Sequence, residues 1–297
     1  MRLRHHDRYD YVPLPDRPDW SWPDGRRLAF CLCNNIEVFS FLDGLGSDHV
    51  AGQGAQTTRN YAWRDYGNRV GLWYLFDLLE EFGLPASHNV NSLLPEYWPR
   101  IVERILDRGD EVIAHGRTNA ERQDILSEGA EEELIREATE GLAAAFGTRP
   151  QGWLGPYIVQ SPVTLDLLKG AGYAYVMDWA ADDQPFWMRT RAGPILSVPY
   201  SIEVNDSPAL VFRHHTGRDF EGMIVDQFDE MLLQSGKRPL VCTVALHPFA
   251  IGQPYRLRAL RRALSHVLEH RDDLWITTPG EIARYCAGLP PGTVPGS

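Results

Sequence analysis

Short apolar runs alternate along the chain with longer segments whose apolar residues recur at helical spacing. A run of four to eight apolar residues between turn residues is typical of a buried strand, and residues 28–33 and 240–246 are of this kind. The same pattern predicts strands over residues 85–91, 112–114, 151–156, 173–177, 195–201 and 275–277. Helical spacing predicts helices over residues 70–82, 99–108, 130–146, 161–169, 220–236 and 255–270, with one more after residue 278.

The alternation of strand and helix, repeated about seven times, predicts an α/β fold. Strands that are apolar along their whole length are typical of parallel sheets that are buried on both faces. No Gly-rich dinucleotide-binding motif follows the first strand, which favours a barrel over a doubly wound sheet. We therefore expect a (β/α) barrel of about seven parallel strands.

The same pattern predicts how the chain is divided. Residues 1–25 are rich in Pro, Asp, Arg and aromatic residues, and predict an extended arm on the body or on a neighbouring subunit. Residues 26–288 predict a single barrel domain, within which the Gly-, Asp- and Asn-rich residues 42–69 are expected to form a long loop. The Pro- and Gly-rich residues 289–297 predict a frayed tail.

The net charge is −11, so we expect no affinity for nucleic acid or for an anionic membrane. No apolar run approaches the ~20 residues that span a bilayer, and residues 1–25 lack the apolar core of a secretory signal. The four cysteines include no CxxC pair and predict buried thiols instead of a disulfide framework. We expect a cytoplasmic protein, and the aromatic arm favours a homo-oligomer.

Polar side chains gather where the expected strands end. In a parallel barrel the active site forms at the carboxyl ends of the strands, so these side chains are expected to meet. One polar strand end is unremarkable, but several in one barrel indicate a site. The set consists of Asn35, Glu37, Asn89, Asn91, His115, Asn119, Trp153, Asp178, Asp182, Asp183 and His247.

His115 and His247 each follow an apolar strand and are candidate acid–base groups. His247 precedes Pro248, which restricts the histidine to an extended conformation and fixes its direction. An imidazole suits general acid or base catalysis near neutral pH. The structural alternative for each is a core histidine that is hydrogen-bonded to a loop carbonyl.

Glu37 has two candidate roles, both together with His115. A carboxylate and an imidazole are standard ligands for Zn²⁺, and Asn119 could add a weak carbonyl oxygen, although a single nitrogen ligand is a poor set for zinc. Without a metal, Glu37 could activate water while His115 orients it. The structural alternative for Glu37 is a salt bridge to Arg69 or Arg117.

An acidic cluster made of Asp178, Asp182 and Asp183 follows the expected strand over residues 173–177. Paired carboxylates can share a proton or orient a histidine, so these residues, together with Trp153, are candidate substrate-binding residues. A surface loop whose aspartates cap the next helix explains the cluster equally well.

Five segments taken together resemble the polysaccharide deacetylase (NodB-homology) family, and more closely its cytosolic allantoinase-like and cyclic-imidase-like branch. They are NNIE at 34–37, HGRTN at 115–119, RPQGWLGP at 149–156, DWAADDQPFW at 178–187 and LHPFAIGQPYRLRAL at 246–260. The order and spacing of these segments carry the resemblance, which covers most of the chain. The family implies a distorted (β/α) barrel and metal-assisted hydrolysis of an acetamide or similar amide bond.

The sequence departs from the family's sugar deacetylases at the positions that serve the metal. The resemblance places Asn35 where those enzymes have the base aspartate, Glu37 where they have a ligand aspartate, and Asn119 where they have a second histidine. Leu154 stands where they usually have an arginine. The allantoinase-like branch likewise lacks the full metal triad, which implies hydrolysis of cyclic amides without the usual metal.

His115 and His247 match the family pattern, and together these observations lead to a hypothesis. We expect a hydrolase that cleaves a carbon–nitrogen bond in a small cyclic or linear amide. Glu37 would activate or position water with the help of His115, and His247 would protonate the leaving nitrogen as general acid. Asn35 and Asn119 would hold the substrate carbonyl by hydrogen bonds.

Two alternatives remain open. The first is a metal-dependent N-deacetylase of an amino-sugar derivative, with Zn²⁺ held by Glu37, His115 and Asn119. The second is a catalytically inactive barrel that binds a small molecule. The cofactor is therefore expected to be either none or a divalent metal, and the partner a small amide, with Trp153, Trp179 and residues 42–69 forming the wall of its pocket.

Overall fold

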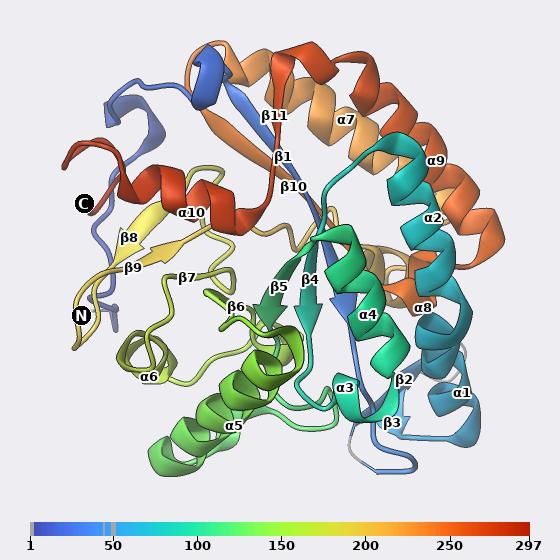
Figure 1. Ribbon diagram of the computed structural model, residues 1–297. Coiled ribbons are helices and arrows are strands. Elements are labelled where there is room, and N and C mark those ends of the chain that lie inside the picture. Colours follow the sequence, from blue (N-terminus) through green and yellow to red (C-terminus); the bar gives the residue numbers. More distant parts are fainter. Residues whose placement is uncertain (1–2, 44, 49–51) are drawn as a thin grey trace.

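The computed structural model describes residues 3–43, 45–48 and 52–297, and shows a curled sheet with helices along its outer side (Figure 1). The strand order is β10-β1-β4-β5-β6-β7-β9-β8, and β11 pairs with β1 next to β4. Every pair in this sheet is parallel except β8 with β9. The predicted barrel of parallel strands is confirmed, in the form of a half-barrel. The strands are β1 (Leu28–Ile36), β4 (Ser87–Val90), β5 (Glu111–Ala114), β6 (Gly152–Trp153), β7 (Tyr175–Val176), β8 (Phe186–Met188), β9 (Ile195–Ser197), β10 (Leu240–Leu246) and β11 (Leu274–Ile276).

β1 forms the centre of the fold. It is buried along its whole length and pairs with β10 from Leu28 opposite Leu240 to Asn34 opposite Leu246. Its other edge pairs with β11 at the start of the strand and with β4 at its end. Both long strands are apolar because helices cover one face and the barrel interior covers the other.

The open side of the half-barrel lies between β8 and β10, and single hydrogen bonds join it instead of a continuous ladder. The Val241 N–H donates to the Asp183 carbonyl at 2.9 Å, and the Ala245 N–H donates to the Val204 carbonyl at 3.0 Å. Asn205 and Ala245 form an isolated parallel bridge. We call this side the seam, and it brings the residues after 204 next to the carboxyl end of β10.

The predicted helices are present, and α2 ends where Gly83 adopts a left-handed φ of 57°. Helix α7 begins with a capping box formed by Thr216 and Asp219. The helices are α1 (Thr58–Tyr66), α2 (Leu72–Phe82), α3 (Leu94–Tyr97), α4 (Pro99–Arg108), α5 (Glu128–Phe146), α6 (Thr164–Gly170), α7 (Gly217–Ser235), α8 (Pro248–Ile251), α9 (Pro254–Glu269) and α10 (Pro279–Ala287).

The prediction of a long loop over residues 42–69 is wrong. This segment contains the hairpin of β2 (Leu45–Asp48) and β3 (Gly52–Ala55), helix α1, and the start of the π-helical turn η3 (Gly67–Gly71). Helix α1 was missed because its sequence, TRNYAWRDY, has almost no apolar periodicity. A Cβ at position 71 would lie 2.2 Å from the Pro248 carbonyl oxygen, so glycine there lets the turn approach the end of β10.

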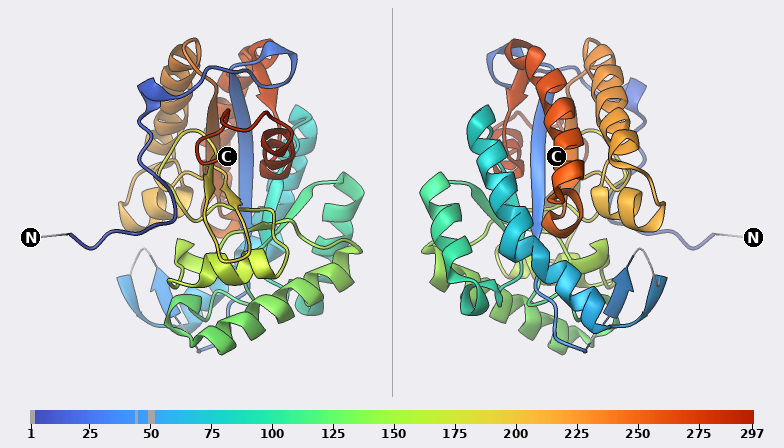
Figure 2. Two further views of the ribbon diagram at one scale, coloured as in Figure 1. Left: turned by 90° about the vertical axis from the view of Figure 1, so that its left-hand side faces the viewer. Right: turned by 90° about the vertical axis from the view of Figure 1, so that its right-hand side faces the viewer.

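The N-terminal arm packs on the body of its own chain, and Figure 2 shows it following one side of the molecule. The Trp22 indole is buried and donates to the Leu240 carbonyl of β10 at 3.0 Å. Arg17 forms an ion pair of 2.6 Å with Asp182, which precedes β8. The arm therefore contacts both sides of the seam.

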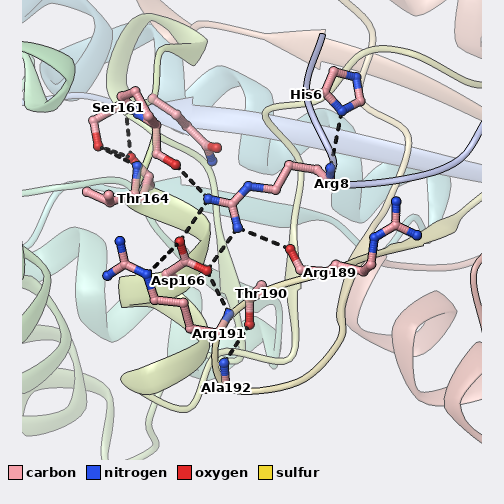
Figure 3. A network of polar contacts seen from close by, with 12 residues as sticks. His6, Arg8, Ser161, Thr164, Asp166, Arg189, Thr190, Arg191 and Ala192 are labelled. Atoms are coloured by element: carbon pink, nitrogen blue, oxygen red, sulfur yellow. Dashed lines mark hydrogen bonds and ion pairs between the residues drawn. The ribbon is translucent and has the colours of Figure 1, made fainter.

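A second ion pair fixes the beginning of the arm (Figure 3). The two terminal nitrogens of Arg8 donate to the two carboxylate oxygens of Asp166 in α6, each at 2.8 Å. The Arg191 backbone N–H donates to the same carboxylate at 2.7 Å. Asp166 is buried, so the arm supplies a charge that compensates the burial of this carboxylate.

The tail that was expected to fray is packed against the body instead. Val294 is buried within the apolar cluster around Trp22, and the Pro295 carbonyl accepts the Trp187 N–H at 2.8 Å. The composition of the tail does not predict this packing, because it depends on only two groups, the Val294 side chain and the Pro295 carbonyl.

All four cysteines are free and buried, as the sequence predicts. Among the residues that the structure describes, no helix combines the length and the apolar character needed to cross a lipid bilayer.

We predict that Arg8→Ala lowers the free energy of unfolding by about 1.5–3 kcal/mol at pH 7, because it removes charged hydrogen bonds to a buried carboxylate. Arg8 lowers the pKa of Asp166 against the opposing effect of burial. This stabilisation is therefore complete above the pKa of an unfolded aspartate and is lost as the pH falls through the lower folded pKa. Urea unfolding of both proteins at neutral and acidic pH measures the difference, which should shrink on acidification.

Arg136→Ala provides the matched control, because Arg136 pairs with Glu133 and Glu140 on the exposed face of α5. Its loss should lower the free energy of unfolding much less than the loss of Arg8, because exposed ion pairs contribute little to stability. An equal loss of stability in the two variants would contradict the role of Arg8.

Candidate active site

A cavity of about 180 Å³ opens at the carboxyl ends of β1, β5 and β10. The three predicted catalytic residues and both predicted substrate-binding asparagines line this cavity, because parallel strands end at the same edge of the sheet. Its polar lining includes Asn35, Glu37, Arg64, His115, Asn119 and His247. Its apolar lining includes Phe39, Trp63, Tyr157, Ile158, Val211 and Phe249.

His247 is held by Asp206, a buried carboxylate that follows the seam. Nδ1 of His247 lies 2.7 Å from one oxygen of Asp206. The other oxygen accepts the backbone N–H groups of His247 at 2.8 Å and of Ile251 at 3.1 Å. The carboxylate is an acceptor, so Nδ1 carries a proton and Nε2 is directed at the cavity.

Glu37 lies between the two histidines. Its Oε1 is 3.5 Å from Nε2 of His247 and 3.8 Å from Nε2 of His115. The same oxygen accepts a hydrogen bond of 2.6 Å from the side-chain nitrogen of Asn119. Three segments that are far apart in the sequence thus converge on one carboxylate oxygen.

The structural alternative for Glu37 is not realised. Arg69 lies 3.8 Å from Asp65, and Arg117 forms its closest contacts with glutamates, among them Glu121 at 2.8 Å. Neither arginine pairs with Glu37, whose ionic contacts among the described residues are the two histidines.

Glu37 and His247 form a buried pair of opposite charges at neutral pH. Burial alone would raise the pKa of Glu37, but the charge of His247 and the contacts with both histidines outweigh it and lower the pKa to about 2. Burial would lower the pKa of His247, but the carboxylates of Glu37 and Asp206 raise it to about 10. Glu37 is therefore a weak proton acceptor, and His247 carries a proton that it can donate.

His115 makes the hydrogen bond to a loop carbonyl that its structural alternative predicts, and it also lines the cavity. Its Nδ1 lies 2.6 Å from the Leu154 carbonyl oxygen, which can only accept, so Nδ1 carries the proton. Nε2 is buried, has no hydrogen-bond partner among the described residues, and faces Glu37. In the neutral ring this nitrogen presents a lone pair to the cavity.

Backbone groups determine which way Asn119 points. Asn91 accepts the Val38 N–H through its side-chain oxygen at 2.7 Å and donates to the His115 carbonyl through its nitrogen. That nitrogen also donates to the side-chain oxygen of Asn119 at 3.0 Å. The side-chain nitrogen of Asn119 is therefore the group that faces Glu37, as its hydrogen bond shows.

The residues Glu37, His115 and Asn119 do not fit a divalent metal. Asn119 directs an N–H donor at the position where a ligand must offer a lone pair, and its oxygen is occupied by Asn91. Across residues 3–43, 45–48 and 52–297, no three His, Cys, Asp or Glu side chains are placed to hold a metal ion. The sequence-based metal alternative thus lacks a complete set of ligands.

Asn35 lines the cavity, but the protein uses most of its hydrogen-bonding capacity. Its side-chain nitrogen donates to the Tyr200 hydroxyl at 2.9 Å and to the Leu246 carbonyl at 3.0 Å. Its oxygen accepts from Asn89 at 2.9 Å. An amide has two N–H groups, so Asn35 can offer a substrate only a remaining lone pair.

Trp153 and Asp178 do not line the cavity, in contrast to the prediction. Trp153 points to the helix layer and packs edge-to-face on Tyr173 within the apolar core. Asp178 is half-buried and outside the cavity lining, where it accepts the Gly155 N–H at 2.7 Å. Successive residues of a strand face opposite sides, so being at a strand end does not decide which side a residue faces.

Asp182 and Asp183 also lie away from the cavity. The Asp182 carboxylate binds Arg17 of the arm. The Asp183 carbonyl accepts the Val241 N–H across the seam. These residues join parts of the fold, and they precede strand β8, so they do not cap a helix as the structural alternative had it.

Asp206 was not among the predicted site residues, and helix α1 was not predicted. Asp206 is hydrogen-bonded to His247. The two residues meet only because the segment before Asp206 lies beside β10 across the seam. Trp63 and Arg64 belong to residues 42–69, which the sequence predicted to form part of the pocket wall, but the helix that carries them was not predicted. Arg64 lies over the Phe39 ring at 3.7 Å and brings a positive charge to the cavity wall.

Comparison with known proteins confirms the resemblance that the five segments indicate. Residues 63–176 match the family model of the polysaccharide deacetylases. A Schizosaccharomyces pombe protein whose name assigns it to the polysaccharide deacetylases is 26% identical over 240 residues, which cover 74% of this chain and 73% of that protein. A peptidoglycan deacetylase of Helicobacter pylori is 21% identical over 244 residues, which cover 71% of this chain and 82% of that enzyme.

Solved structures show the same fold over almost the whole chain. PuuE allantoinase matches with a TM-score of 0.84 at 27% identity, covering 92% of this chain and 95% of that chain. A Pseudomonas aeruginosa PAO1 protein, also named for the polysaccharide deacetylases, matches with a TM-score of 0.82 at 26% identity, covering 91% of this chain and 94% of that chain.

We predict that Asp206→Asn lowers the pKa of His247, because it removes one of the two carboxylates that raise it. The folded pKa lies above that of an unfolded histidine, so the stabilisation by these charges is complete below about pH 6.5 and is lost as the pH rises through the folded value. An NMR titration of the His247 ring measures the shift. The matched control Asp182→Asn should leave the titration unchanged, and an unaltered midpoint in Asp206→Asn would contradict the assignment.

Proposed function

We propose that this chain, which is similar to the polysaccharide deacetylases over residues 63–176, hydrolyses a carbon–nitrogen bond in a small cyclic or linear amide. The observation that carries the proposal is the position of Glu37, with one oxygen 3.5 Å from the protonated His247 and 3.8 Å from His115. Amide hydrolysis is promoted by a group that accepts a proton from water and a group that donates a proton to the leaving nitrogen. His115 and His247 lie on either side of Glu37 in positions that suit these two roles. The similarity to an allantoinase structure supports a cyclic amide as substrate.

The cavity favours a small substrate. Its volume of about 180 Å³ and its ring-rich wall provide room for a compact planar group. Phe39, Trp63 and Phe249 offer apolar faces, while the polar groups converge at one place. This lining suits an amide ring or a short acyl group better than a long polar chain.

The nucleophile in the proposed mechanism is a water molecule held by Glu37 and His115. Glu37, with its lowered pKa, orients the water through its charge and remains ionised. Nε2 of His115 accepts the water proton while the water oxygen attacks the amide carbon. The second N–H of the Asn119 side chain, beyond the one directed at Glu37, stabilises the negative charge on the amide oxygen.

His247 acts as the general acid in the second half of the reaction. Its Nε2–H transfers a proton to the leaving nitrogen, the carbon–nitrogen bond breaks, and a carboxylic acid and an amine are released. Asp206 holds the ring in the orientation that makes this transfer possible. The proton that His115 received returns to solvent or to His247, so the groups are restored and the net change is the addition of one water molecule.

The metal-dependent N-deacetylase is the weaker proposal, because Asn119 directs a donor group at Glu37. The inactive binding barrel is also weaker, because the His247–Asp206 pair has the geometry of an acid held ready for proton transfer.

The cytoplasmic location and the self-association remain predictions from the sequence. The aromatic residues of the arm make contacts within the same chain, which account for its composition.

We predict that Glu37→Gln and His247→Ala each lower kcat by about 10²–10⁴-fold, the contribution typical of a positioned acid–base group. The substrate comes from a panel of allantoin, hydantoins, succinimide-type imides and small acylamides. His266→Ala is the matched control, because that histidine pairs with Asp229 on the surface, away from the cavity. Full activity in both site variants would refute the proposed roles, and binding without turnover across the panel would favour the inactive barrel.

We predict that activity survives exhaustive chelation, because the residues around Glu37 do not form a metal site. The measurement compares kcat before and after dialysis against EDTA, together with elemental analysis of the purified protein. A stoichiometric metal whose removal abolishes activity, with recovery on adding Zn²⁺, would establish the deacetylase alternative.

A further inference from the structure

One peptide group connects Asp178, a half-buried aspartate, to His115. The Leu154 carbonyl accepts the Nδ1–H of His115 at 2.6 Å. The N–H of the same peptide, which belongs to Gly155, donates to the Asp178 carboxylate at 2.7 Å. The chain of contacts therefore runs from Asp178 through this peptide to the ring that faces Glu37.

The surroundings hold this peptide in place. A Cβ on Gly155 would lie 2.8 Å from the Asp178 oxygen and 2.9 Å from the Val159 carbonyl oxygen, so only glycine fits. The following residues Tyr157 and Ile158 adopt left-handed φ values of 62° and 57°. Such a conformation is costly for a β-branched residue and persists only where its surroundings enforce it. Both residues line the cavity, so this tight turn forms part of its wall.

We propose that Asp178 is a positioning residue for His115 and acts through the Leu154–Gly155 peptide. This inference rests on the proposed function of His115 as proton acceptor. It gives a role to a carboxylate that the mechanism does not otherwise use and that lies outside the cavity.

The physical basis is the cooperativity of hydrogen bonds in a buried chain. A carboxylate that accepts the peptide N–H polarises the peptide and makes its carbonyl a stronger acceptor. The stronger acceptor holds the proton of His115 on Nδ1 and leaves the Nε2 lone pair towards Glu37. His247 has a direct counterpart in Asp206, so each histidine is oriented by an aspartate, one directly and one across a peptide.

The groups that face Asp178 are neutral. They are the Gly155 N–H, the side-chain amide of Gln160 and the N–H of Asp178 itself. Trp179, the next residue, packs against His6 and Tyr9 of the arm, and Asp182 is neutralised by Arg17. No described residue forms an ion pair with Asp178, and burial raises its pKa to about 7. The carboxylate is therefore charged above neutral pH and protonated below it.

The first experiment observes His115 directly and needs no substrate. The ¹⁵N and ¹H resonances of the His115 ring are compared in the wild type, Asp178→Asn and Asp178→Ala, with Asp182→Asn as the matched control. We expect the Nδ1–H proton to move upfield and exchange faster in both Asp178 variants and to stay unchanged in the control. An unchanged Nδ1–H in folded Asp178→Asn would overturn the proposal.

Gly155→Ala gives an independent test if Asp178→Ala does not fold. The new Cβ would displace the Asp178 oxygen, so the same change in the His115 resonances is expected with the carboxylate still present. Near-ultraviolet circular dichroism establishes that each variant is folded. A normal His115 spectrum in folded Gly155→Ala would contradict the relay through the peptide.

The second experiment uses whichever amide the wild type cleaves. We expect Asp178→Asn to lower kcat by about 10- to 100-fold, a part of what an acid–base group contributes, with KM changed less than about twofold. Wild-type kcat should rise with pH through a midpoint near the pKa of Asp178, about 7, and this step should be absent from Asp178→Asn. A retained step, or a loss confined to KM, would overturn the proposal.

The two experiments separate failure of this inference from failure of the proposed function. If no amide of the panel is cleaved, the proposed function fails, while the ring resonances still decide whether Asp178 controls His115. If an amide is cleaved and Asp178→Asn behaves like the wild type in both experiments, only the positioning role fails.

Discussion

The rest of the site depends on the burial of one pair of opposite charges, Glu37 and His247. Charges taken out of water destabilise a protein unless other groups compensate them, and here the compensation comes from several directions. Asp206 holds the far nitrogen of His247, Asn119 donates to Glu37, and His115 approaches the same oxygen. The carboxyl end of each contributing strand is therefore constrained, because a shift of any one would leave a charge uncompensated in the interior.

Asn119, which the resemblance places where sugar deacetylases have a second histidine, donates a hydrogen bond to Glu37. Asn119 stabilises the Glu37 anion with an N–H, and the orientation of Asn119 follows from Asn91 and the backbone of β1 and β5. The replacement of a ligand by a donor thus changes how the carboxylate charge is balanced. The neighbouring histidine supplies the positive charge, so the site does not need a cation to keep Glu37 ionised.

The sequence predicted every strand of the curled sheet except β8, most helices and the barrel class, because apolar periodicity is a local signal. Polar strand ends, also a local signal, led to three catalytic candidates, which line the cavity. It did not predict helix α1, whose residues serve the cavity instead of an apolar core and so lack periodicity. Strand position also could not show which face Trp153 occupies or that Asp182 pairs with the arm. Asp206 was missed because its contact with His247 arises across the seam, where two segments meet that no repeat or spacing relates.

The N-terminal arm connects the two borders of the seam. Trp22 ties the arm to β10, and Arg17 ties it to the segment before β8, so the arm spans the gap that the sheet leaves open. His247 extends from β10 and Asp206 from the opposite border of the same gap. The hydrogen bond between His247 and Asp206 thus joins two different borders of the sheet. The orientation of the His247 ring therefore depends on the contacts that hold the two borders of the seam together.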